Sequence, residues 1–65
     1  MKLHVNGEER ECQAEFLLAL MEELGVRTDR IAVVVNEQVI PAARRAELRL
    51  TDGDQIEFLT FAGGG

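Results

Sequence analysis

The last three residues, Gly63, Gly64 and Gly65, are the part of the sequence whose residue types best suit chemistry. They end the chain in a carboxylate without a neighbouring side chain, and glycine accepts many backbone angles without needing room for a Cβ. Residues 62–65 reach at most about 13–14 Å when extended. This run directly follows a segment of alternating apolar residues. We therefore interpret it as a narrow extended tail that carries the Gly65 carboxylate into another protein's active site. An inert, disordered tail is the alternative.

The other reactive residues are too few to build a catalytic or metal site within the chain. His4 is the single histidine and Cys12 the single cysteine, so a Cys/His zinc site and an internal disulfide are both excluded. The pattern also lacks a nucleophile with a histidine and an orienting third group. We interpret His4 as a surface residue without a role and Cys12 as a small, partly buried apolar residue, with a sulfur-relay thiol as the alternative. The sequence therefore predicts a protein that is not an enzyme and that binds no metal.

The charge and hydropathy of the chain argue against nucleic acid and membranes as partners. Twelve acidic residues against seven basic ones give a net charge of −5, whereas binding to phosphates requires clustered Lys and Arg. The longest apolar stretch, residues 16–21, is far shorter than the ~20 residues of a membrane span. The N-terminal residues do not resemble a signal peptide, and a lone thiol is typical of a reducing compartment. These features predict a cytoplasmic protein.

An alternating segment followed by a turn pair predicts a hairpin at the start of the chain. Leu3 and Val5 alternate with polar residues, and Asn6-Gly7 favours a type I′ turn between two strands. The returning residues 8–12 are strongly charged, which is typical of an edge strand.

One helix is predicted over residues 15–24. Its apolar stripe has the spacing i, i+3, i+4 and i+7, and consists of Leu17, Leu20, Met21 and Leu24. Gly25 stands where a left-handed residue ends many helices. Because no Ser, Thr, Asp or Asn precedes the stripe to cap it, we expect the start of the helix to be frayed.

An apolar run in the second half of the chain predicts another strand. Residues 31–35 are mostly β-branched and too few for a helix, so we expect a strand covered on both faces or nearly so. The remaining predicted elements are a turn at residues 36–37, a strand over residues 38–40 that Pro41 ends, an irregular or single-turn segment over residues 42–50, a tight turn at residues 52–54 and a last strand over residues 55–61.

These elements predict one α+β domain, a two-layer roll in which a mixed sheet of four to five strands packs on one α-helix. If the helix is a crossover, the first and last strands lie side by side and parallel at the centre of the sheet. We expect the domain to span residues 1–61 and a flexible glycine-rich tail to span residues 62–65. The expected core combines the helix stripe with Leu3, Val5, Ile56 and Phe58.

The last strand is expected to present apolar side chains beside the tail. If Ile56 and Phe58 pack on the helix, Leu59 and Phe61 point to the opposite face of the sheet. Apolar groups exposed at one place usually mark a partner site, so we predict that Leu59 and Phe61 bind a partner. The alternative is that the curl of the sheet or residues 42–50 cover them.

Several short motifs occur in a characteristic order along the chain. They are Val5-Asn6-Gly7-Glu8, a helix over residues 17–25 that ends in Glu-Glu-Leu-Gly, Val34-Val35-Asn36-Glu37, Val39-Ile40-Pro41, Leu50, Asp52-Gly53-Asp54-Gln55-Ile56 and Gly64-Gly65. In this order and spacing the sequence resembles the ThiS family of ubiquitin-like β-grasp sulfur carriers over essentially its whole length. Two residues depart from the family: Phe16 stands where a helix-capping Thr is common, and Gly63 where another small residue is frequent.

The resemblance implies a cycle of chemistry on the Gly65 carboxylate. A ThiF-like adenylyltransferase would use ATP and Mg²⁺ to form the acyl-adenylate, so the carrier itself needs no cofactor. Sulfur from a cysteine desulfurase or a related persulfide would replace AMP. The resulting thiocarboxylate would donate sulfur to thiazole synthase ThiG, which builds the thiazole of thiamine.

Three alternatives remain open at this point. The first is a sulfur carrier of another pathway, either the small subunit of molybdopterin synthase or a carrier for cysteine or methionine synthesis. The second is a ubiquitin-like modifier joined to lysines of other proteins. The third is an interaction module with an inert tail, for which deletion of Gly64 and Gly65 would leave function unchanged.

Overall fold

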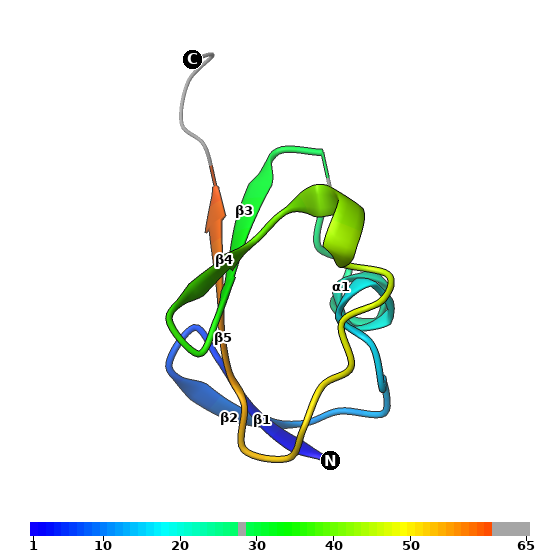
Figure 1. The fold of residues 1–65 in the computed structure, drawn as a ribbon. Helices are drawn as coiled ribbons and strands as arrows, with labels where there is room; N and C mark the ends of the chain where they lie inside the picture. Colours follow the sequence, from blue (N-terminus) through cyan, green and yellow to red (C-terminus); the bar gives the residue numbers. More distant parts are fainter. Residues whose placement is uncertain (28, 61–65) are drawn as a thin grey trace.

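The computed structural model describes residues 1–27 and 29–60, which form one mixed sheet with a single α-helix, α1 (Leu17–Leu24), against one face (Figure 1). The strands are β1 (Lys2–Val5), β2 (Glu8–Glu11), β3 (Ile31–Val35), β4 (Gln38–Ile40) and β5 (Gln55–Thr60). Their order across the sheet is β2-β1-β5-β3-β4. The predicted α+β roll of a mixed sheet on one helix is confirmed.

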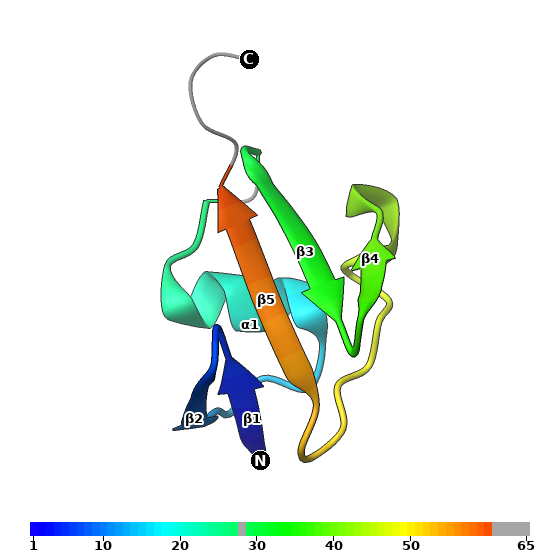
Figure 2. The same ribbon diagram turned by 90° about the vertical axis from the view of Figure 1, so that its left-hand side faces the viewer.

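The central strand of the sheet is β5, which lies between β1 and β3 with α1 behind it (Figure 2). It pairs in parallel with β1 through His4↔Gln55 and Val5↔Ile56. It pairs antiparallel with β3 from Val35↔Ile56 to Ile31↔Thr60. The prediction that the first and last strands are adjacent, parallel and central is therefore confirmed.

Both hairpins turn through two residues with positive φ. Asn6 and Gly7 have φ of 50° and 84° between β1 and β2, and Asn36 and Glu37 have 49° and 72° between β3 and β4. Positive φ at both central positions is the requirement of a type I′ turn. Every residue of β2 is exposed, as expected for an edge strand.

The helix begins at Leu17, two residues later than predicted, and its Phe16 cap forms no side-chain hydrogen bond. Its first amide groups are bonded by a distant segment instead. The Leu17 N–H donates to the Leu48 carbonyl at 2.9 Å, and the Leu18 N–H donates to the Arg45 carbonyl at 3.0 Å. Main-chain oxygens thus satisfy the N–H groups that a capping side chain would otherwise satisfy.

The helix ends as predicted, at Gly25, which is left-handed with φ of 72°. The Gly25 N–H donates to the Glu22 carbonyl and the Val26 N–H donates to the Met21 carbonyl. This pair of bonds is a Schellman motif, in which the left-handed residue lets the chain reverse over the last helical carbonyls.

The connection between β4 and β5 contains one turn of 3₁₀ helix, η1 (Ala42–Arg44), as the sequence suggested. The residue that follows it, Arg45, is only 6% exposed. Its Nη2 donates a hydrogen bond of 2.6 Å to the Ile31 carbonyl on β3. Through this side chain and the Leu18 contact, the connection is bonded to both layers of the fold.

The core lies between α1 and the facing side of the sheet. It consists of Leu3, Val5, Cys12, Leu17, Leu20, Met21, Val33, Val35, Leu50 and Ile56. Leu24 and Phe58, which we expected in the core, are only partly buried and pack against its edge. Cys12 is 2% exposed, so it is fully buried rather than partly buried as predicted.

The face of β3 away from α1 is only partly covered, whereas we expected a strand covered on both faces or nearly so. Val33 and Val35 are buried beneath α1, whereas Ala32 and Val34 are only half-buried. A single helix covers one face of a sheet, and successive side chains of a strand point to opposite faces. Every second residue of the apolar run therefore faces away from the core.

Candidate functional site

The part of the structure that leads to the predicted reactive group is the end of β5. This strand is paired with β3 as far as its last residue, Thr60. Phe61 and the three glycines Gly63, Gly64 and Gly65 lie outside the described residues. The predicted tail at residues 62–65 thus begins two residues after the last residue of the central strand.

Leu59 lies on the face of the sheet opposite α1. Ile56 is 1% exposed and Phe58 packs against the core, whereas Leu59 is 50% exposed. This alternation is that of a strand with one buried face. The exposure shows that neither the curl of the sheet nor residues 42–50 cover Leu59, which was the alternative to a partner-binding role.

Leu59 belongs to a larger apolar surface that the sequence analysis did not find. Ala32 is its cross-strand partner on β3, and Val34 pairs with Val39 on β4. Val39 is 72% exposed. We call Leu59, Ala32, Val34 and Val39 the open-face patch. The alternation within residues 31–35 could have indicated it, because a single helix leaves every second residue of that run uncovered.

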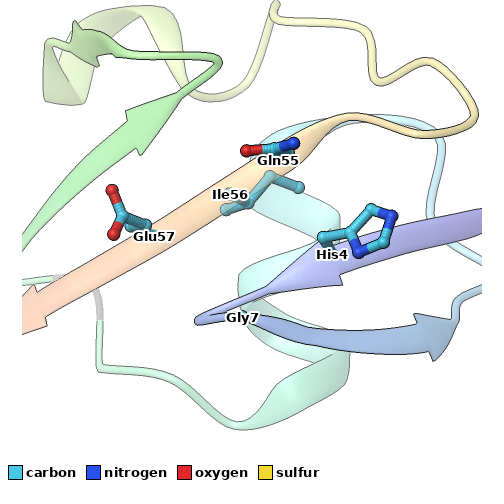
Figure 3. Close-up of a pocket in the computed structure, with 5 residues that line it drawn as sticks. All are labelled: His4, Gly7, Gln55, Ile56 and Glu57. Atoms are coloured by element: carbon cyan, nitrogen blue, oxygen red, sulfur yellow. The ribbon is translucent and has the colours of Figure 1, made fainter.

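A shallow hollow adjoins the open-face patch along the seam between β1 and β5. It has a volume of about 310 Å³ and is lined by His4, Gly7, Gln55, Ile56 and Glu57. In Figure 3 the His4 side chain projects from β1, and those of Gln55 and Glu57 project from β5. Glu57 is the cross-strand neighbour of Val34, so a carboxylate borders the apolar patch. Such a surface suits a partner that combines apolar and basic side chains.

The Cys12 thiol is poorly suited to a role in sulfur transfer. It is free and buried, and burial, followed by the nearby Glu23 carboxylate, raises its pKa. The thiolate is the nucleophilic form of cysteine, so both its low access and its raised pKa disfavour reaction at Cys12. The structure thus favours the interpretation of Cys12 as a core residue over that of a relay thiol.

The part of the chain that the structure describes contains neither a cluster of metal ligands nor a membrane-spanning helix. In residues 1–27 and 29–60, no group of three or more His, Cys, Asp or Glu side chains could hold a metal ion. In the same ranges, no helix has the length and apolarity that crossing a membrane requires.

Comparisons with known proteins find relatives over the whole chain. The model of the ThiS family matches residues 3–65. The sulfur carrier protein ThiS of Thermus thermophilus is 33% identical over 61 residues, which cover 94% of this chain and 95% of that protein. A crystal structure of the thiamine biosynthesis protein ThiS from Geobacter metallireducens superposes with a TM-score of 0.87 at 33% identity and covers all of both chains. The predicted ubiquitin-like β-grasp fold is thereby confirmed.

A second group of relatives consists of much longer proteins. The thiazole synthases of Paramagnetospirillum magneticum and Magnetococcus marinus are 42% and 36% identical over 66 residues that cover all of this chain. The chain spans only 20% of the length of either of them. A region similar to this chain is therefore part of a thiazole synthase sequence in both organisms.

Proposed function

The chain belongs to the ThiS family, and we propose that it is a sulfur carrier of thiamine biosynthesis whose reactive group is the Gly65 carboxylate. The observation that carries this proposal is the family match, which extends through residue 65. The carrier supplies the carboxyl group at the end of its glycine run, while its partners supply the catalytic groups. It therefore acts as a substrate of other enzymes rather than as an enzyme.

In the proposed cycle, a ThiF-like adenylyltransferase first activates the Gly65 carboxylate. One carboxylate oxygen attacks the α-phosphorus of MgATP and pyrophosphate leaves, which converts a poor electrophile into an acyl-adenylate. The persulfide of a cysteine desulfurase or a related donor then attacks the acyl carbon, and AMP leaves. A thiol reduces the resulting acyl disulfide and releases the thiocarboxylate on Gly65. ATP and Mg²⁺ belong to the adenylyltransferase, so the carrier needs no cofactor.

The proposed recipient of the sulfur is thiazole synthase ThiG. This partner is supported by the two relatives described as thiazole synthases, in which a region similar to this chain belongs to the longer protein. Physical linkage in those proteins would bring carrier and synthase to a high effective concentration. We place the cycle in the cytoplasm, without nucleic acid or membrane partners.

Docking of the folded body is proposed to offset the entropy that the tail loses when it enters an active site. Ordering a residue's backbone costs roughly 1–2 kcal/mol. Leu59, with the rest of the open-face patch, offers apolar area close to the end of β5. We propose that Leu59 and Phe61 contact the adenylyltransferase and, in a later step, the synthase.

Intact-protein mass spectrometry tests the proposal. After incubation with its adenylyltransferase, MgATP and a sulfur donor, the protein should carry one sulfur in place of one oxygen, and fragmentation should locate the change at Gly65. A variant without Gly64 and Gly65 is the matched control and should remain unmodified. Wild-type protein whose mass does not change when a ThiS of known activity is loaded in parallel would overturn the sulfur-carrier function.

The same sample distinguishes the other pathways. Thiocarboxylated protein should support thiazole formation with ThiG, and it should not be consumed by a molybdopterin synthase large subunit or by enzymes of cysteine or methionine synthesis. Isopeptide conjugates to lysines of other proteins in cells would indicate a ubiquitin-like modifier instead.

A further inference from the structure

Two asparagines form hydrogen bonds to opposite edges of β5, each through its main-chain N–H and its side-chain Oδ1. Asn6 and Asn36 are each the first residue of a hairpin turn, with φ of 50° and 49°. The Asn6 N–H donates to the Ile56 carbonyl and its Oδ1 accepts the Phe58 N–H, both at 2.9 Å. The Asn36 N–H donates to the Gln55 carbonyl at 2.8 Å, and its Oδ1 accepts the Gln55 N–H at 3.0 Å.

The two contacts differ in where they hold the strand. Asn36 binds Gln55, the first residue of β5, whereas Asn6 binds Phe58, two residues before the end of the strand. The last residue pair between β1 and β5 is Val5↔Ile56. Beyond it the chain turns away through Asn6-Gly7, and Figure 3 shows this turn, marked by Gly7, alongside β5. β1 has ended at this point, so it offers no main-chain carbonyl to the Phe58 N–H. The Asn6 Oδ1 accepts that hydrogen bond instead.

We propose that Asn6 is a positioning residue for the carrier reaction, because it fixes the second half of β5 and with it the point from which the tail starts. This inference rests on the proposed function of Gly65. β3 holds one edge of β5 up to Thr60, and Asn6 holds the other edge at Phe58. A strand bonded on both edges moves less than one bonded on a single edge, and the rate of a reaction depends steeply on how the reacting groups are placed.

The decisive variant is Asn6→Gly, because glycine keeps the positive φ and removes the side-chain acceptor. Asn6→Asp keeps an acceptor and, like Asn, tolerates the left-handed conformation. Asn36→Gly is the matched control. It removes an equivalent acceptor together with the 2.9 Å bond from Asn36 Nδ2 to Asp54, so it should destabilise the fold at least as much as Asn6→Gly does.

Two measurements test the role of Asn6. Amide hydrogen exchange followed by NMR should show a loss of protection at Phe58 in Asn6→Gly and at Gln55 in Asn36→Gly. Single-turnover adenylylation of Gly65 by the ThiF-like enzyme, at a temperature where all variants are folded, should slow by about tenfold in Asn6→Gly. The KM for the carrier should change less than the rate, because Ala32, Val34 and Val39 of the open-face patch lie on β3 and β4, away from the Asn6 contact. Asn36→Gly and Asn6→Asp should react at rates close to wild type.

The outcomes separate a positioning role from a structural one. Equal slowing in Asn6→Gly and Asn36→Gly would show that only stability matters and would overturn the inference. An unchanged rate in Asn6→Gly, or no recovery in Asn6→Asp, would overturn it as well. If wild-type protein is not adenylylated at all, the proposed function fails first and the positioning role fails with it.

Discussion

Leu59 is the described residue for which a partner role can be tested most directly. Its side chain is half exposed on the open face of β5, so a charge there is not forced into the core. We expect Leu59→Glu to change the free energy of unfolding by less than about 0.5 kcal/mol. The same substitution should weaken binding to the ThiF-like adenylyltransferase by tenfold or more, about 1.4 kcal/mol, as measured by isothermal titration calorimetry.

The matched control for Leu59→Glu is Gln38→Glu. Gln38 is exposed and pairs with Val35 on β3, so it faces the side of the sheet away from the open-face patch. This variant adds the same charge and should bind like the wild type. Phe61→Glu should behave like Leu59→Glu. Unaltered binding of both Leu59→Glu and Phe61→Glu would show that the partner docks elsewhere.

The elements themselves were predictable where their signals are local. Asn6-Gly7 and the charged β2 specify the first hairpin, and Gly25 specifies the end of α1 through its left-handed backbone. The start of α1 was not predictable, because its first N–H groups are bonded by the carbonyls of Leu48 and Arg45. Those partners are distant in sequence, and only the folded chain brings them to the helix.

The β3–β4 turn contains a residue with an unfavourable backbone conformation. Glu37 has φ of 72°, in a region that costs non-glycine residues roughly 1–2 kcal/mol, whereas glycine enters it freely. Glu37→Gly should therefore raise the free energy of unfolding by about 0.5–1 kcal/mol in urea denaturation. Glu37→Ala removes the same charge but keeps the strained φ, and it should give no gain. An equal gain in both variants would assign the effect to charge rather than to the backbone.

For the molecule as a whole, the predicted site divides into a part visible in the sequence and a part created by the fold. The glycines at the end of the chain and the alternation of Phe58 and Leu59 are local features, and the exposure of Leu59 agrees with them. The open-face patch arises from the order β5-β3-β4, which places Val34 beside β5 and Val39 beside Val34. The prediction that β3 is covered on both faces or nearly so concealed this patch, because the described residues place a helix on only one face of the sheet.

Arg45 bonds the two layers of the fold to each other. Its buried guanidinium donates to the Ile31 carbonyl on β3, and its own carbonyl accepts the Leu18 N–H at the start of α1. Arg45→Ala removes the first bond and the packing of the aliphatic stem, and we expect a loss of about 2 kcal/mol in the free energy of unfolding. Arg45→Met restores most of the buried volume without the hydrogen bond, so its loss should be smaller. Chemical denaturation of the three proteins measures both differences. Wild-type stability in Arg45→Ala would mean that the Leu18 and Leu48 main-chain bonds alone hold the connection against the helix.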